Sequence, residues 1–273
     1  GTRRRWPLHS ALAIARIYTR SMLTYRTRTL VSLVSTLVAI FPIYYVAAAL
    51  RDFAARAVQG HAPDYFGYVI VGSIGVFVVT EAASSIPSIV NSYINSGMLE
   101  QLLGTPARWP SVLAGVSMYG FAWVALRALI VLATAWILGQ SLHWVRLPEA
   151  VLVFALVALV VLPVGLAGAA CVLVTRSTLW LPQVAITGAT LFGSVYFPAT
   201  ALPPALTWIG EAMPLTPALA AARKLLLLDA PIADVLPLLG PVALWAVGGL
   251  LVGGGLFAAA LRHARRAGTL TQY

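Results

Sequence analysis

The chain has 273 residues, of which 60% are hydrophobic and 10% are charged, and its mean hydropathy is +0.89. Soluble proteins contain roughly 45–50% apolar and about 25% charged residues, so this composition excludes a soluble enzyme and indicates a protein that folds in a lipid bilayer. The net charge of +10 does not indicate a nucleic-acid partner, because the arginines cluster beside apolar runs. Cys171 is the single cysteine, which excludes an internal disulfide.

Residues 8–28 precede the first long apolar run and mix apolar and basic residues at helical spacing. Arg16 and Arg20 share one face of the expected helix, and apolar side chains recur near another. This pattern predicts an amphipathic helix in the membrane interface. Such a helix either anchors the chain on anionic lipid or also contacts a partner in the cytoplasm.

Long apolar stretches follow along the rest of the chain. A helix needs about 20 mostly apolar residues to cross about 30 Å of hydrocarbon, because its backbone polar groups must be satisfied within the segment. The six stretches that we predict to cross are Leu30–Leu50, Phe66–Val90, Ser111–Leu138, Glu149–Val174, Leu181–Phe197 and Val235–Leu261. Together they predict an all-α membrane protein with one transmembrane domain over residues 1–273.

The distribution of lysine and arginine predicts the orientation, because positive charge near a span resists translocation. With both termini in the cytoplasm, twelve basic residues lie inside and five lie outside. The five on the outside are Arg51, Arg56, Arg146, Arg223 and Lys224. We therefore expect a multi-pass protein with both termini in the cytoplasm.

The link between the second and third spans predicts a short cytoplasmic helix over residues 97–105. Ser96 or Gly97 can begin it, Gly104 suits its end, and Pro106 prevents its continuation. The apolar face of this helix carries Met98, Leu99, Leu102 and Leu103. The opposite, polar face carries Glu100 and Gln101. One of these faces can lie in a groove on a partner protein.

Residues 198–234, between the fifth and sixth spans, are both apolar and rich in proline. Neither half of this segment is long enough to cross a bilayer. Irregular backbone is tolerated at membrane depth where it is buried in protein. We therefore expect two short re-entrant helices that dip into the outer leaflet.

Two ionisable residues fall inside spans, where each costs about 2.5–3.5 kcal/mol near the helix centre on insertion scales. Counted along the helices from the cytoplasmic side, Glu81 lies about 14 Å deep and Arg127 about 24 Å deep. Arg127 either reaches towards Glu81 or extends to the outer interface. Glu81, with Ser84 and Ser85 one turn further on, has either a structural hydrogen-bonding role or a role in a substrate path.

Two further patterns concern the last two spans. Phe192, Tyr196 and Phe197 near the outer end of the fifth span form either an interfacial aromatic belt or the lining of an apolar exit path. Gly249 and Gly253 in the last span have the small-xxx-small spacing that allows close helix approach. We expect this pair to pack within the chain rather than against a second copy.

Signatures of catalysis, metal binding and nucleotide binding are missing from the sequence. The four histidines have no metal-ligand spacing, so we expect neither a metal site nor another cofactor. A phosphate-binding loop needs a Gly-Lys-Ser or Gly-Lys-Thr ending, whereas the single lysine, Lys224, follows Arg223. The chain is therefore not an enzyme, and an energy-driven function requires another subunit.

Two segments carry a resemblance to a known family. The run Gly97-Met98-Leu99-Glu100-Gln101-Leu102-Leu103-Gly104-Thr105-Pro106 is similar to the Gly-Thr-Leu-Glu-Gln-Leu-Leu-x-x-Pro segment of type 2 ATP-binding-cassette (ABC) permeases. The run Tyr196-Phe197-Pro198-Ala199-Thr200-Ala201-Leu202-Pro203-Pro204, followed by Met213-Pro214-Leu215-Thr216, is similar to the family's Phe-Pro-x-x-x-Leu-Pro and Asn-Pro-Leu-Thr runs. The chain resembles in particular the bacterial drug-exporter class that includes daunorubicin-resistance permeases.

The resemblance implies a six-span permease of the bacterial plasma membrane. Residues 8–28 would be the connecting helix, residues 97–105 the coupling helix on an ATPase subunit, and residues 198–234 the re-entrant extracellular pair. Two ATPases, which hold the ATP and magnesium, would work with two permeases, the second being an identical copy or a paralogue. Together they would export a drug, a lipid or another amphiphile by alternating access, although polysaccharide and glycolipid exporters share the architecture.

Two other classes of function compete with an ATP-driven exporter. An ion- or proton-driven carrier would use Glu81 and Arg127, although the sequence lacks the inverted repeat that many such carriers contain. A membrane scaffold or assembly subunit would carry no substrate and would not associate with an ATPase.

Overall fold

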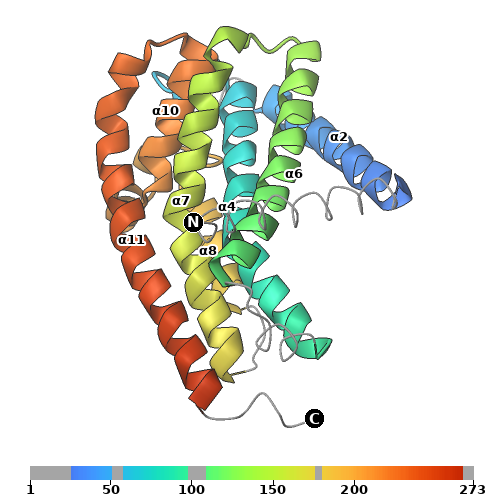
Figure 1. Ribbon diagram of the computed structural model, residues 1–273. Helices are drawn as coiled ribbons and strands as arrows, with labels where there is room; N and C mark the ends of the chain where they lie inside the picture. The colour runs from blue at the N-terminus through green and yellow to red at the C-terminus, as the bar shows by residue number, and fades with distance from the viewer. Residues whose placement is uncertain (1–25, 51–57, 98–108, 176–179, 267–273) are drawn as a thin grey trace, which may run out of the picture.

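The computed structural model describes residues 26–50, 58–97, 109–175 and 180–266, and in this part of the chain every regular element is a helix (Figure 1). The long helices are α2 (Arg26–Ala49), α4 (Tyr65–Asn95), α6 (Trp109–Ile137), α7 (Leu147–Thr175) and α11 (Ile232–Arg266). The shorter helices are η1 (Trp144–Arg146), α8 (Trp180–Phe192), η2 (Ala199–Ala201), α9 (Thr207–Ala212) and α10 (Leu215–Leu228). The predicted all-α architecture is confirmed for these residues.

Five of the described helices are long and apolar enough to cross a membrane. The candidate spans are Leu30–Ala49, Tyr65–Asn95, Ser117–Ile137, Trp144–Thr175 and Ile232–His263. They coincide with five of the stretches predicted from the sequence, because the length and hydropathy of a segment are enough to identify a helix that crosses the bilayer by itself.

The structure corrects the fifth predicted stretch, Leu181–Phe197. Its helix, α8, has only 13 residues, about 20 Å of helix, which is too short to cross the hydrocarbon unaided. The helix ends where Ser194 adopts a φ of 57°, a left-handed conformation that interrupts a right-handed helix. The chain turns over residues 193–198, which we call the elbow, and then continues through η2 and α9 into α10.

Helix α4 lies in the centre of the bundle and contacts α2, α6, α7, α8 and α10. It begins at Asp64, whose carboxylate accepts a hydrogen bond of 3.0 Å from the backbone N–H of Gly67. Ser96 is its C-terminal cap, and Gly97 follows with a φ of 67°. Ser96 and Gly97 therefore follow directly on α4, and the helix predicted over residues 97–105 lies beyond Gly97 outside the described residues.

Helices α7 and α11 lie side by side along most of their length (Figure 1). A Cβ atom on Gly249 would lie 2.9 Å from Pro163 Cγ, and one on Gly253 would lie 2.7 Å from Pro163 O. The two glycines thus let α11 approach the backbone of α7, which confirms the prediction that they pack within the chain.

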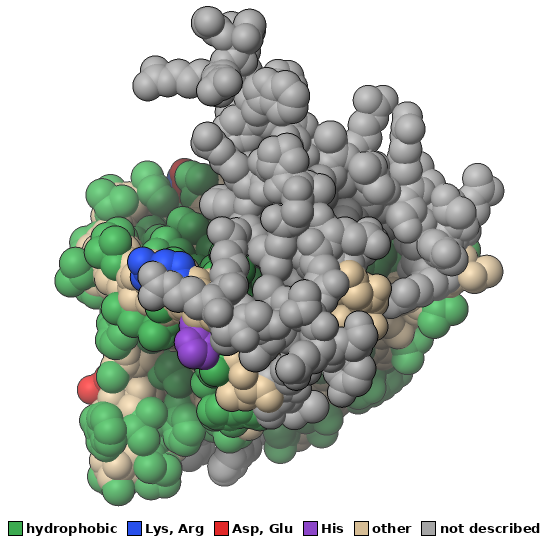
Figure 2. All heavy atoms as spheres, turned by 60° about the horizontal axis from the view of Figure 1, so that its bottom comes forward, with side chains coloured by type: hydrophobic (Ala, Val, Ile, Leu, Met, Phe, Trp, Pro, Cys, Tyr) green, Lys and Arg blue, Asp and Glu red, His purple; other side chains and the backbone are tan. Residues whose placement is uncertain are grey.

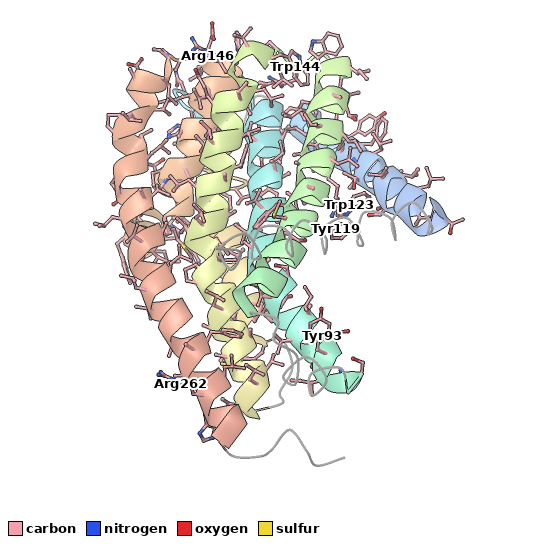
Figure 3. The ribbon with its side chains drawn as sticks, viewed as in Figure 1. Tyr93, Tyr119, Trp123, Trp144, Arg146 and Arg262 are labelled. Carbon is pink, nitrogen blue, oxygen red and sulfur yellow. The ribbon has the colours of Figure 1, made fainter. Side chains whose placement is uncertain are left out.

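The outer surfaces of the long helices are apolar. Helix α2 leans away from the other helices in Figure 1, and its large side chains, including Leu30, Val31 and Val34, are exposed. Hydrophobic side chains also dominate the described atoms at the edge of the face shown in Figure 2. Arg146 and Trp144 lie at one end of the bundle and Arg262 near the other, as Figure 3 shows. An apolar surface between polar ends is the arrangement of a helix bundle in a bilayer.

Candidate functional site

The predicted intramembrane arginine lies between three helices. Arg127 of α6 donates a hydrogen bond of 3.0 Å from Nε to the hydroxyl of Thr36 in α2, a residue that is 2% exposed. Its guanidinium carbon lies 4.5 Å from the centre of the Phe77 ring in α4. A hydrogen bond together with an aromatic face gives the cation favourable contacts in a medium of low polarity.

Glu81 lies one turn beyond Phe77 on α4, and its carboxylate occupies the space that a Cβ atom on Gly120 of α6 would need. Among the described residues, no ion pair joins Glu81 to Arg127. Ser84 is half-buried, and the hydroxyl of Ser85 is buried without a hydrogen-bond partner in the described part of the chain. The structure therefore places these four polar side chains along α4 and its contacts with α2 and α6.

Sequence reasoning missed the most buried charge among the described residues. The charge count places Arg223 among the basic residues outside, but in the structure this residue of α10 is only 1% exposed. Its Nη2 lies 2.8 Å from the carbonyl oxygen of Ser194, 3.2 Å from that of Val195 and 3.1 Å from that of Tyr68. We call these four residues the Arg223 cluster.

In the Arg223 cluster, backbone carbonyl groups of the non-helical elbow obtain hydrogen-bond donors. Arg223 Nε also donates to the Tyr68 carbonyl at 3.2 Å, and the Tyr68 hydroxyl donates to the Ser194 carbonyl at 3.0 Å. The guanidinium carbon lies 3.4 Å from the centre of the Tyr68 ring. A buried guanidinium and buried carbonyl groups would each cost free energy if left unpaired. Their contact therefore stabilises the elbow against α4 and α10.

Gly72 makes this close contact possible. A Cβ atom at this position would overlap the carbonyl oxygen of Val195 and would lie 3.1 Å from Arg223 Nη2. The one signal that could have identified the cluster is an arginine within the apolar helical run from Leu215 to Leu228, where it shares a face with Leu219 and Leu226.

The aromatic residues proposed for a belt or an exit path surround the elbow. Phe192 ends α8 and is half-buried, whereas Tyr196 and Phe197 lie within the elbow and are exposed. Val195, which lies between Phe192 and Tyr196 in the sequence, is buried. The exposed rings therefore lie on the outer side of the elbow, while its backbone carbonyls face Arg223.

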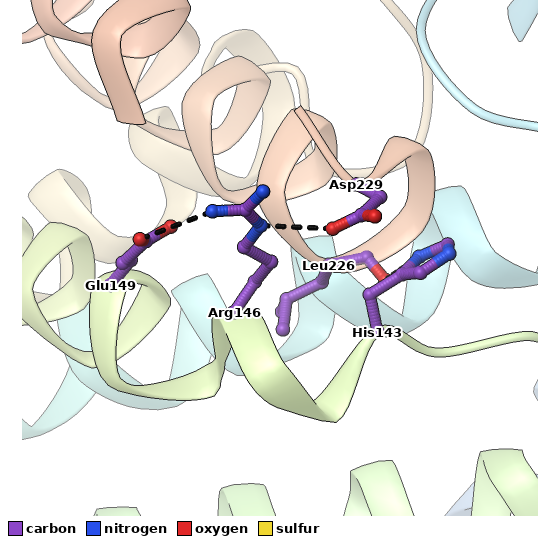
Figure 4. A network of polar contacts seen from close by, with 5 residues as sticks. All are labelled: His143, Arg146, Glu149, Leu226 and Asp229. Carbon is purple, nitrogen blue, oxygen red and sulfur yellow. Dashed lines mark hydrogen bonds and ion pairs between the residues drawn. The ribbon is translucent and has the colours of Figure 1, made fainter. Parts of the chain in front are cut away.

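A polar network attaches the start of α7 to the end of α10 (Figure 4). Arg146 donates to Asp229 at 2.9 Å and to Glu149 at 3.3 Å. The backbone N–H of His143 donates to the Leu226 carbonyl at 3.0 Å. The hydrogen bond from Arg146 lowers the pKa of Asp229 below its usual value. These contacts hold α10 from its C-terminal end, opposite the elbow.

The remaining predicted site residues lie outside the described residues. They are Met98, Leu99, Glu100, Gln101, Leu102 and Leu103 of the expected coupling helix, and Arg16 and Arg20 of the expected connecting helix.

The described residues define a multi-pass membrane protein, in which two half-length helices, α8 and α10, pack among five longer apolar ones. Among these residues no group of three or more potential ligands could hold a metal ion. The sequence model of the ABC-2 type transporter family matches residues 12–227. Because the match covers most of the chain, this protein belongs to that family. A search among curated proteins gave no match.

Membership of the family establishes what kind of component the chain is. It is the membrane component of an ABC-2 type transporter, a non-catalytic transmembrane subunit without a cofactor of its own. ABC permeases generally work with a separate ATPase subunit.

Proposed function

We propose that the chain is the transmembrane subunit of an ATP-driven exporter, which moves an amphiphilic small molecule, drug or lipid out of the cytoplasm or the inner leaflet. The observation that carries this proposal is the family match over residues 12–227. The resemblance of residues 97–106 and 196–216 to drug-exporter permeases supports the daunorubicin-resistance-like class in particular.

In this proposal the working unit contains two permeases, identical or paralogous, and two ATPase subunits that hold ATP and magnesium. The protein lies in the bacterial plasma membrane with both termini in the cytoplasm. Helix α8 and the elbow take the place of a complete fifth span, so that six segments enter the membrane. Helices α9 and α10 form the re-entrant pair. The nearly complete burial of α10 supports this assignment, because a half-length helix at membrane depth must be covered by protein.

Helix α4 would transmit movement from the ATPase to the re-entrant segment. It ends at Asn95, directly before the expected coupling helix, and its other end carries Tyr68 of the Arg223 cluster. From Tyr68 to Asn95 the helix rises by about 40 Å. Pro87 interrupts the hydrogen bonding within α4 and is a natural bending point between the two ends.

The polar and aromatic residues would lie along the path of the substrate. Glu81, Ser84, Ser85 and Arg127 would offer polar contacts where α2, α4 and α6 meet. Phe192, Tyr196 and Phe197 would offer an apolar surface at the elbow. Such a combination suits an amphiphile, because each part of the molecule meets matching chemistry.

Substitution of Glu100 tests the coupling assignment. We expect Glu100→Lys to abolish transport-linked stimulation of the ATPase in proteoliposomes that contain both subunits, without changing the melting temperature of the permease. Glu211→Lys, at an exposed position on α9, is the matched control for the change of charge and should behave as the wild type. Normal transport and normal stimulation in Glu100→Lys would contradict the proposal.

A second reading, the ion-coupled carrier, rests on the placement of Glu81 and Arg127 at the α2–α4–α6 contact. It predicts transport by the permease alone, and loss of that transport in Glu81→Gln. A polysaccharide or glycolipid exporter differs from a drug exporter only in substrate. Stimulated ATP hydrolysis in a screen of drugs, lipids and glycolipids distinguishes the two.

A further inference from the structure

A cavity of about 300 Å³ lies within a single copy of the chain, between α4, α7, α8, α11 and the link from α9 to α10. Every side chain that lines it is apolar, including Val79 of α4, Val157 of α7, Ala189 of α8 and Leu215 of α10. The cavity is separate from the polar residues where α2, α4 and α6 meet, because none of those residues lines it.

Both half-length helices contribute residues to the lining of the cavity. Helix α8 ends at Phe192 and α10 begins at Leu215, so neither half-length helix fills the space beyond its own end. Pro163 and Gly249, which are in contact, both line the cavity. This contact between α7 and α11 fixes the distance between the two helices, so α11 cannot move inward to fill the space.

Neither an empty cavity nor a water-filled one suits this lining. The free-energy cost of a void rises with its volume, because the lining atoms lose their dispersion contacts. Water needs two to four polar partners, and this lining offers very little polar surface. The occupant must therefore be apolar.

The rim of the cavity is exposed on the outside of a single copy, and on α11 it lies within the candidate span Ile232–His263. Trp245 of α11 lines the cavity and is 58% exposed. Val184 and Leu191 of α8, close in sequence to the lining residues Ala185 and Ala189, are also exposed. Around such a surface the apolar material available is hydrocarbon chain.

We propose that this cavity binds the distal part of one acyl chain of a phospholipid from the surrounding bilayer. The site belongs to each copy of the chain by itself and does not depend on the proposed export activity or on an ATPase partner. The bound chain fills the space between α8, the start of α10, α7 and α11.

Photo-crosslinking of the full-length protein in proteoliposomes tests this proposal. One phospholipid carries a diazirine near the end of an acyl chain, and a second carries it near the headgroup. The terminal label should react with the peptides that contain Val157 and Ala189, whereas the headgroup label should react with them at least fivefold less.

Ala189→Phe, which fills the cavity, should reduce this reaction at least fivefold while leaving the reaction at exposed α2 unchanged. Ala155→Phe is the matched control, because it adds the same group at an exposed position of α7. Val161→Phe fills the cavity from the opposite wall and replaces Ala189→Phe if that variant does not fold. Equal labelling by the two lipids, or unchanged labelling in folded variants with a filled cavity, overturns the proposal.

Discussion

Replacement of Arg223 by methionine should destabilise the protein more than any other loss of a single charge among the described residues. The change removes hydrogen bonds from a charged donor to the carbonyl groups of Tyr68, Ser194 and Val195. Each such bond contributes about 1.5–3 kcal/mol, but the contributions do not add fully, because the Tyr68 hydroxyl still donates to Ser194. We expect the free energy of unfolding to fall by about 3–5 kcal/mol.

The measurement is unfolding of the purified protein in detergent, followed by circular dichroism as the fraction of SDS rises. Lys224→Met is the matched control, because it removes a charge from the next residue, which is only half-buried. We expect this control to change the free energy by less than about 1 kcal/mol. Arg223→Lys should lie between the two, since an ammonium group keeps the charge but not the planar fork of donors. Equal stability of Arg223→Met and Lys224→Met would refute the reasoning.

Three further predictions concern other contacts. Gly253→Ala should destabilise the protein by about 1–3 kcal/mol in the same assay, because its Cβ would lie 2.7 Å from Pro163 O. Gly254→Ala is the control: Gly254 has open space around it, so this change should be neutral or stabilising by up to about 1 kcal/mol. A double-mutant cycle of Arg127→Gln and Thr36→Val should give a coupling energy of about 0.6–1.7 kcal/mol, and a value of zero would mean that the observed hydrogen bond contributes nothing. Because hydrogen bonding to Arg146 lowers the pKa of Asp229, its stabilising contribution should be complete above the ordinary pKa of 3.8 and should be lost as the pH falls from there through the lowered pKa of the folded state. Melting temperatures of the wild type and Asp229→Asn should accordingly differ at pH 7 and converge in acid; a difference that does not depend on pH would contradict this assignment.

Hydropathy identified the segments whose helices are long enough to cross the bilayer, and it failed for the segment whose helix ends too early to cross. The five long spans could be predicted because a helix surrounded by lipid must satisfy its backbone within its own length. The stretch Leu181–Phe197 is just as apolar, yet the backbone leaves the helix at Ser194. The break leaves carbonyl groups of the elbow without helical partners, and Arg223, about 30 positions further along the chain, donates hydrogen bonds to them. Hydropathy cannot detect the break, because it does not report a partner so distant in the sequence.

The candidate site was only partly accessible to the same reasoning. Glu81 and Arg127 could be selected because each is an ionisable residue inside an apolar run, but their partners, Gly120 and Thr36, are ordinary residues of other helices. The sequence places Arg223 on the outside because it belongs to the segment between the fifth and sixth predicted spans. Only tertiary contacts distinguish a solvated arginine from a buried one. The expected coupling and connecting helices stay predictions, since they lie outside the described residues.

The continuity of α4 limits how its length can change during evolution. One inserted residue between Tyr68 and Glu81 would turn everything beyond it by about 100° and advance it by about 1.5 Å. Glu81 would then leave Gly120, and the segment that follows Asn95 would point in another direction relative to Arg223. Insertions and deletions in α4 should therefore be accepted only when they add or remove close to a whole number of helical turns. Homologues should keep the same rotation between the two ends of α4 even where its sequence diverges.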